Sequence, residues 1–397
     1  MLALVSLAEL LGMSLWFAAT SVAPQLAERW GLDASQAAWL TTVVQLGFVV
    51  GTAGIALFNL ADLFPARLLF AVCAILGAAA NLGLIVARDY ATALTLRFST
   101  GLFLAGVYPP AMKMIATWFK AHRGLAIGSV VGALTVGKAL PYLIKAIGGA
   151  NLTFVVTSTS AGALGAALLV GTLFREGPYP FARRSFSWGL VGAVLRDRPT
   201  RLAIASYLGH MWELYAMWVW LPVFLTASLA ARGAGPASAG LANALAFGGL
   251  AAGGMGCVWG GWMAARWGYA KVVTVAMAIS GACSIAIGLL FGSSPWLVVP
   301  VAWCWGFFVV ADSAQFSAMV TETAPPHAVG TALTLQTSLG FLITMVTIQL
   351  VPVMVEVVGW RWAFAVLALG PAAGILAARP LAAAPATARQ APADFSP

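Results

Sequence analysis

The stretch REGPYPFARRSFSWGLVGAVLRDRPTR, residues 175–201, is the longest polar interruption in an otherwise strongly apolar chain. It contains six arginines and two acidic residues. On both sides of it, short polar turns separate apolar runs of about 20 residues, the length with which a helix crosses a bilayer. Six such runs precede the stretch and six follow it. This pattern of apolar runs therefore predicts a membrane protein made of two halves.

The composition supports this interpretation. The chain has 397 residues, of which 61% are hydrophobic and 8% charged, whereas soluble domains carry about 25% charged residues. We therefore predict an all-α, polytopic membrane protein with twelve spans. The predicted spans are 2–25, 36–58, 68–87, 91–113, 124–147, 152–174, 202–228, 238–263, 271–292, 296–320, 329–354 and 359–378.

These spans divide the chain into four regions. Residues 1–174 form an N-terminal six-helix half, 175–201 a cytoplasmic linker, and 202–378 a C-terminal six-helix half. Residues 379–397, which are rich in alanine and proline, are expected to be a disordered cytoplasmic tail. Within the linker, SFSWGLVGAVL is expected to form a short interfacial helix.

The net charge of +9 is explained by the orientation of the chain in the membrane. With a cytoplasmic N-terminus, thirteen lysines and arginines fall in inside segments and five in outside loops, the bias of the positive-inside rule. We expect an inner (plasma) membrane protein with both termini in the cytoplasm. No basic patch with interleaved aromatic residues is present, so a nucleic-acid partner is not expected.

Two loop motifs occur once in each half. FNLADLFPARLLF at 58–70 corresponds to GGWMAARWGYAKVV at 260–273, and AHRGLAIG at 121–128 corresponds to PHAVGTAL at 326–333. Duplicated halves of this kind are typical of secondary transporters.

On these motifs the chain resembles the major facilitator superfamily. The family's loop between its second and third helices reads G-x-L-(A/S)-D-R-(F/Y)-G-R-R. The positions that match in the first copy are Leu60, Ala61, Asp62, Phe64 and Arg67, and those in the second copy are Gly256, Gly261, Ala264, Arg266, Trp267, Gly268 and Lys271. Leu63, Pro65, Ala66 and Ala265 depart from the pattern, and the antiporter-type fifth-helix pattern is poorly matched, with Lys138 in place of its proline.

The resemblance implies two six-helix halves around a central cavity, and a gate at the loop motif. Asp62, Arg67 and Arg266 are the candidate gating residues, because an Asp at a helix end and a base one turn away can join neighbouring helices in one state only. The alternative is an ordinary solvated charge pair.

Few charges lie inside the predicted spans, and each costs roughly 2.5–3.5 kcal/mol at a helix centre. The mid-span acids are Glu9, Glu213 and Asp312, and the mid-span bases are Arg97 and Lys138. In the family that this chain resembles, the first, fourth, seventh and tenth helices line the substrate path, and Glu9, Arg97, Glu213 and Asp312 lie on them. Pro109 and Pro110 are expected to break the fourth helix locally.

Three roles remain open for Lys138: binding an anionic substrate, pairing with Asp312 or Glu213 across the halves, or a structural pair within the first half. The candidate substrate-binding residues are Lys138, Arg97, Trp16, Tyr108, Trp212 and Gln315. The candidate proton-coupling residues are Glu213, Asp312, Glu9 and His210, the last lying three residues before Glu213. No metal site and no cofactor are expected.

The sequence therefore predicts a transporter rather than an enzyme, since it shows no nucleophile or metal constellation and no Walker A pattern. We predict a monomer that moves a small anion by alternating access, coupled to protons. The alternatives are a proton-driven exporter of amphipathic or cationic drugs, or a non-transporting sensor or assembly factor. The anion itself, the direction of transport and sodium coupling are left open.

Overall fold

The computed structural model describes residues 1–58, 60–119, 123–148, 151–179, 187–235 and 238–382. The described residues are helices joined by short turns, which confirms the all-α prediction. The helices before the linker are α1 (Leu2–Met13), α2 (Ala18–Ser21), α3 (Ala23–Trp30), α4 (Ala34–Leu57), α5 (Leu60–Leu63), α6 (Ala66–Val86), α7 (Tyr90–Leu104), α8 (Tyr108–Ala116), α9 (Arg123–Gly148) and α10 (Leu152–Leu173).

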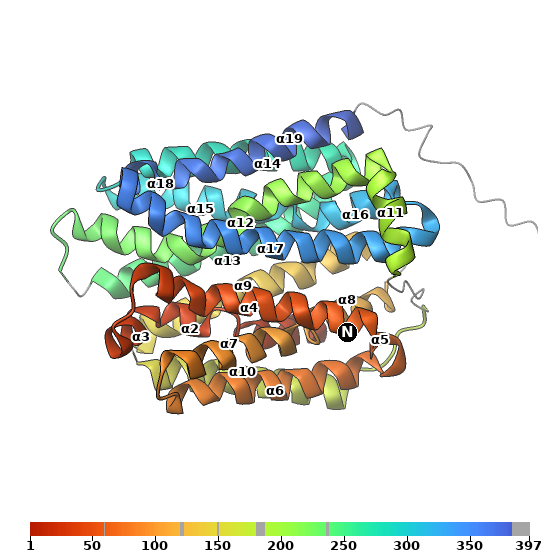
Figure 1. Ribbon diagram of the computed structural model, residues 1–397, viewed down its shortest axis with the longest axis horizontal. Coiled ribbons are helices and arrows are strands. Elements are labelled where there is room, and N and C mark those ends of the chain that lie inside the picture. Colours follow the sequence, from red (N-terminus) through yellow and green to blue (C-terminus); the bar gives the residue numbers. More distant parts are fainter. Residues whose placement is uncertain (59, 120–122, 149–150, 180–186, 236–237, 383–397) are drawn as a thin grey trace, which may run out of the picture.

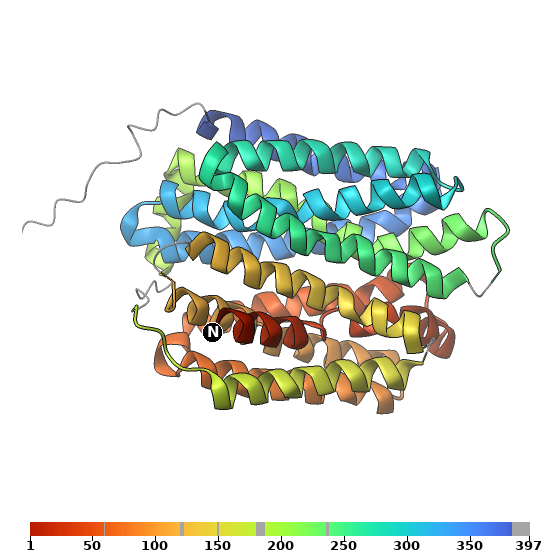
Figure 2. The same ribbon diagram turned by 180° about the vertical axis from the view of Figure 1, so that it is seen from behind.

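The second half follows the linker. Its helices are α11 (Trp188–Arg196), α12 (Arg198–Ala230), α13 (Ser238–Trp267), α14 (Tyr269–Leu289), α15 (Pro295–Ala311), α16 (Ser313–Thr323), η1 (Pro326–Ala328), α17 (Val329–Val358), α18 (Trp360–Ala363), η2 (Phe364–Ala368) and α19 (Leu369–Ala382). In Figure 1 the helices before the linker lie below those after it, with their long axes roughly parallel, and Figure 2 shows the same division from behind.

Ten of the twelve predicted spans appear in the described chain as segments long and apolar enough to cross a membrane. The other two, the predicted first and fourth spans, are interrupted. The first stops being helical at Ser14–Phe17, between α1 and α2, and the fourth at residues 105–107, between α7 and α8. A third interruption, at Asp312, separates α15 from α16.

The break in the fourth span confirms the prediction made from Pro109 and Pro110, which occupy the first turn of α8. Proline is tolerated there because the first N–H groups of a helix have no partner in any case. The linker helix is also confirmed, as α11. Helix α19 extends to Ala382, four residues into the predicted tail, and the remainder of the tail lies outside the described residues.

Glycines allow the helices to pack closely within each half and between the halves. Gly47 and Gly101 lie where α4 crosses α7, and Gly256 and Gly260 lie where α13 crosses α15, so that a side chain at any of the four would meet the backbone of the other helix. Between the halves, α9 and α13 cross at Gly132 and Gly254, where an added Cβ would come within 2.9 Å of the opposite carbonyl oxygen.

A second pair of helices, α4 and α17, joins the halves through polar side chains. Ser35 donates to Gln349 Oε1 at 2.9 Å, and Gln349 Nε2 donates to Thr42 Oγ1 at 3.2 Å. These bonds tie the beginning of α4 to the C-terminal part of α17.

Candidate functional site

Arg97 in α7 holds the interruption between α1 and α2. Its guanidinium is fully buried and donates to the carbonyls of Leu15 at 3.2 Å, Trp16 at 2.5 Å and Leu40 at 3.3 Å. Carbonyls freed where a helix ends need partners, because no water reaches them inside the bilayer. Arg97 therefore supplies donors to a broken helix, and its planar fork reaches several acceptors at once.

Asn81 in α6 orients this arginine. Its Oδ1 accepts from Arg97 at 3.4 Å, and its Nδ2 donates to the carbonyl of Val156 at 3.3 Å and to the hydroxyls of Thr159 at 3.2 Å and Ser160 at 2.9 Å. Asn81 is buried and joins α6, α7 and α10. Although it is the only asparagine in its apolar run, sequence reasoning did not single it out.

Lys138 lies on α9 with its amine among aromatic side chains from both halves. The amine donates to the hydroxyl of Tyr215 on α12. It lies 3.9 Å from the ring centroid of Trp16, 4.8 Å from that of Tyr215 and 5.4 Å from that of Trp218. An ammonium at such distances is attracted to the ring faces. The side chain is buried, with 3% of its surface exposed.

More aromatic rings extend this environment. Trp16 contacts Phe48 and Phe341 at centroid distances of 5.1 and 5.7 Å, and Phe17 contacts Tyr142 and Trp218 at 6.2 and 6.0 Å. We call this group the aromatic enclosure; its members are Trp16, Phe17, Phe48, Tyr142, Tyr215, Trp218 and Phe341. It takes residues from α4, α9, α12 and α17 and from the α1–α2 interruption, so it lies between the two halves.

Several polar groups of this region are buried without a hydrogen-bond partner among the described residues. They are both carboxyl oxygens of Glu9, the indole nitrogens of Trp16 and Trp218, and the hydroxyl of Tyr142. Glu9 lies near enough to Lys138 to interact with it electrostatically. Unsatisfied buried groups are rare in folded proteins and call for a specific explanation.

Glu213 on α12 lies in a second polar group, within the C-terminal half. Its carboxyl accepts from the indole of Trp305 at 2.7 Å and from the hydroxyl of Ser280 at 2.8 Å. All three side chains are buried. Trp305 and Ser280 come from α15 and α14, so this carboxyl group joins three helices.

His210 and Asp312 pair at the interruption between α15 and α16. His210 Nδ1 lies 2.9 Å from Asp312 Oδ1, and its Nε2 lies 3.1 Å from the hydroxyl of Ser313. The pairing fixes which ring nitrogen faces the carboxylate. The structure thus brings His210 to Asp312, whereas the sequence had associated it with Glu213.

The remaining candidates are dispersed. Tyr108 stacks on Phe48 at 6.5 Å beside the aromatic enclosure. Trp212 donates its indole N–H to the carbonyl of Val366 at 3.1 Å, and Gln315 donates to the carbonyl of Ala311 in its own turn at 2.9 Å. These last two bonds serve backbone groups.

The predicted gating residues lie at helix ends. Arg67 and Arg266 are exposed, and the guanidinium of Arg266 lies 3.6 Å from the ring centroid of Trp262. The side chain of Asp62 lies outside the described residues, so the predicted latch stays a prediction.

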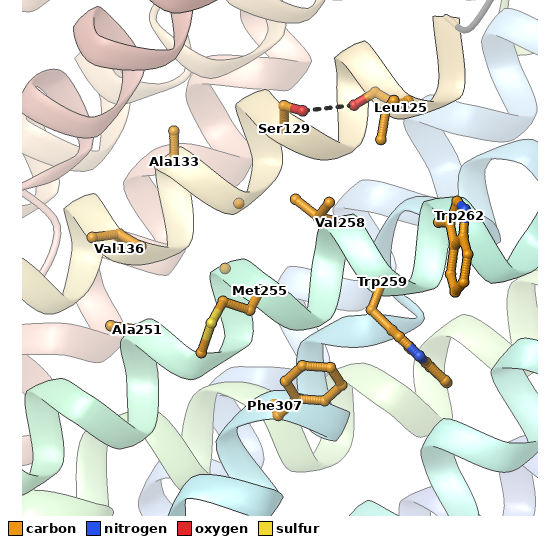
Figure 3. Close-up of a pocket in the computed structure, with 12 residues that line it drawn as sticks. Leu125, Ser129, Ala133, Val136, Ala251, Met255, Val258, Trp259, Trp262 and Phe307 are labelled. Atoms are coloured by element: carbon orange, nitrogen blue, oxygen red, sulfur yellow. Dashed lines mark hydrogen bonds between the residues drawn. The ribbon is translucent and has the colours of Figure 1, made fainter.

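A large apolar cavity among the described residues is not lined by Lys138. It is a groove of about 720 Å³ between α9 and α13, and Figure 3 shows Leu125 and Val136 on one side and Met255, Val258 and Trp262 on the other. No charged residue lines it. Its lining is mostly apolar, and the hydroxyl of Ser129 donates to the carbonyl of Leu125. We therefore place the candidate site at the aromatic enclosure, where charged side chains are buried.

Comparison with known proteins agrees with this architecture. The sequence model of the Major Facilitator Superfamily matches residues 5–254, more than half of the chain. No curated relative matches the sequence.

Solved structures share the fold. A bacterial homologue of the human lysosomal transporter Spinster, solved in an inward-facing and unoccupied conformation, has a TM-score of 0.70 at 16% identity, covering 99% of this chain and 98% of that one. The nucleoside transporter NupG has a TM-score of 0.72 at 14% identity, covering 96% and 99%. At these identities the likeness establishes the fold alone.

Proposed function

The chain belongs to the Major Facilitator Superfamily and is a transporter rather than an enzyme, and we propose that it carries a small organic anion together with protons. The observation that supports the anion is the buried amine of Lys138, whose polar partner is the Tyr215 hydroxyl rather than a carboxylate. Glu9 interacts with the amine electrostatically but shares no hydrogen bond with it. A buried cation is costly unless an anion pairs with it directly, and an anionic substrate would supply that pairing.

The unpaired groups of the aromatic enclosure suit the same substrate. The indole N–H groups of Trp16 and Trp218 and the hydroxyl of Tyr142 are donors without an acceptor, and a carboxylate has lone pairs for all of them. The rings would contact the apolar body of the substrate. An organic acid therefore fits the enclosure better than a compact inorganic ion does.

Glu9 links the anion to protons in this proposal. It interacts electrostatically with Lys138, and neither of its carboxyl oxygens has a hydrogen-bond partner. A substrate anion beside Lys138 would repel a charged Glu9 and favour its protonated form. Anion and proton would then bind together, as symport requires.

Glu213 and the His210–Asp312 pair form a second candidate proton site in the C-terminal half. The pair lies at the end of α15, where a change of charge would act on the position of α16. We propose that movement of the two halves about the enclosure transfers both ligands, with Asp62, Arg67 and Arg266 acting at the gate. A monomer in the inner membrane with both termini in the cytoplasm belongs to the same proposal.

A second candidate is the export of amphipathic or cationic drugs. The unpaired carboxyl group of Glu9 favours it, because an organic cation could displace the amine of Lys138 from the ring faces. The two candidates predict opposite roles for Lys138.

A thermal-shift screen of purified protein separates them. Carboxylates, inorganic anions and organic cations are tested on the wild type, on Lys138→Met and on Lys145→Met. The last is a matched control on the same helix, whose amine donates to the carbonyl of Ser21 at 2.7 Å. A ligand at 100 times its Kd stabilises the folded state by about 2.7 kcal/mol.

For an anion transporter, carboxylates stabilise the wild type and Lys145→Met but not Lys138→Met. Stabilisation by cations that persists or grows in Lys138→Met would instead establish the exporter. In proteoliposomes, Glu9→Gln, Glu213→Gln and Asp312→Asn test proton coupling. At least one should lose accumulation driven by a pH gradient and keep substrate exchange; accumulation retained in all three would refute coupling through these residues.

A further inference from the structure

A second cavity lies at one end of the C-terminal half. It has a volume of about 330 Å³ and lies between the α13–α14 turn and the end of α19. Its lining residues are Trp267, Gly268, Tyr269, Ala270, Lys271, Thr274, Arg379 and Ala382. These residues belong to the end of α13, the beginning of α14 and the end of α19, so the cavity lies at the ends of three helices that are long and apolar enough to cross a membrane.

The lining is positively charged. Lys271 and Arg379 come from helices more than 100 residues apart in the sequence, and both are exposed. No acidic residue lines the cavity. Glu322 interacts electrostatically with Tyr269, and it also takes part in other contacts. The fold thus brings together two bases around one small cavity.

Aromatic side chains complete the wall. Lys271 Nζ lies 5.3 Å from the ring centroid of Trp267, whose ring packs at 87° and 6.1 Å against that of Trp259. Tryptophan and tyrosine are enriched at the depth of the lipid headgroups. The position of Trp267 and Tyr269 therefore agrees with a cavity at the membrane surface.

We propose that this cavity binds the phosphate of an anionic phospholipid. Arg379 offers a planar fork that matches phosphate oxygens and Lys271 a point charge, while Trp267 and Tyr269 would contact the glycerol region. The volume lies at the lower end of the range of ligand pockets and suits a headgroup. Basic pockets between helices on the cytoplasmic side of membrane proteins take such headgroups, and the distribution of charge along the sequence predicts that this end faces the cytoplasm.

Native mass spectrometry of the purified protein with added lipid tests the proposal. Phosphatidylglycerol is the anionic probe and phosphatidylcholine, with the same acyl chains, the zwitterionic one. Lys271→Gln and Arg379→Gln are tested singly and together. Arg361→Gln is the matched control: Arg361 is exposed on α18, at the opposite end of α14, where its carbonyl lies beside Gly288.

We expect phosphatidylglycerol to bind more tightly than phosphatidylcholine. Each single substitution should weaken its binding about fivefold, and the double substitution about thirtyfold, from the attraction that one base contributes near an anionic headgroup. Equal binding of the two lipids, an unchanged double variant, or an equal loss in Arg361→Gln would overturn the proposal.

Inorganic phosphate distinguishes a lipid from a free anion. In the same measurement, millimolar phosphate should leave the bound phosphatidylglycerol in place. If phosphate alone binds, with the same dependence on Lys271 and Arg379, and displaces the lipid, the site belongs to a soluble anion and the lipid proposal is wrong.

Discussion

Replacing Arg97 by methionine is expected to destabilise the protein rather than simply to remove a substrate contact. The guanidinium makes four buried hydrogen bonds, three to the carbonyls of Leu15, Trp16 and Leu40 and one to Asn81. Hydrogen bonds between helices in a membrane protein contribute about 0.6 kcal/mol each on average. Three of the four donor–acceptor distances are 3.2 Å or longer, so we assign the average contribution to each bond. The four hydrogen bonds together then stabilise the folded protein by about 2.5 kcal/mol.

Arg97→Lys retains the charge but offers a compact ammonium that cannot span four acceptors. We expect Arg97→Lys to lose about half as much stability as Arg97→Met. Arg88→Met is the control, since Arg88 is exposed at the end of α6, and surface substitutions of this kind change stability by about 0.5 kcal/mol or less.

The assay is equilibrium unfolding in mixed micelles, in which the fraction of SDS is raised and tryptophan fluorescence is followed. Ligand binding is measured on the same samples. If Arg97→Met keeps wild-type stability to within about 0.5 kcal/mol and loses substrate binding, then Arg97 is a substrate ligand, as the sequence suggested. The structural role described above would then be refuted.

Three further predictions concern packing, capping and the contact between the halves. Gly260→Ala should unfold more readily than the wild type, because its Cβ would collide with the backbone carbonyl of Ala311 on α15. Gly54→Ala, with open space around it, should be neutral or stabilising by about 1 kcal/mol in the same unfolding assay. Asp89 caps α7 by accepting from the Thr92 N–H at 2.7 Å, which holds the pKa of this carboxyl below its usual 3.8. Asp89→Ala should therefore lower the Tm at pH 6. The difference in Tm between this variant and the wild type should shrink as the pH falls through the lowered pKa. A constant difference from pH 6 to pH 3 would contradict the cap. Gln349→Ala removes two hydrogen bonds between α17 and α4. It should shift the population about sevenfold towards conformers in which the ends of these helices separate, as measured by distances between spin labels. An unchanged distance distribution would show that these bonds do not hold the halves together.

Local chemistry explains what could be predicted from the sequence. The length of the apolar runs gave the helices, and Pro109 and Pro110 gave the interruption of the fourth span, because proline acts within its own turn. The interruption at Ser14–Phe17 contains neither proline nor glycine. Its carbonyls are held by Arg97, which lies about eighty residues away in the sequence, and no local pattern reports such a contact.

The candidate site was predictable in part for the same reason. Lys138 was identified because a charge in an apolar run is conspicuous. Trp16 was identified because it lies seven residues after Glu9, on the same face of a helix, and the structure brings Lys138 and Trp16 together. Trp218 and Tyr142 were missed, since each is one aromatic residue among many. Trp218 follows Tyr215 by three positions, and this spacing on one helix face was the signal available. Which indole groups would lack a partner depends on packing between the halves.

The crossing of α9 and α13 has a mechanical consequence. At Gly132 and Gly254 the two helices meet backbone to backbone, with no side chain from either glycine inserted between them. Interlocked side chains resist sliding because each must leave its rotamer before the helices can move. The contact between Gly132 and Gly254 lowers this barrier at the crossing point, while Thr135 and Val136 still pack beside it. We therefore expect the crossing to act as a pivot when one half of the protein turns against the other.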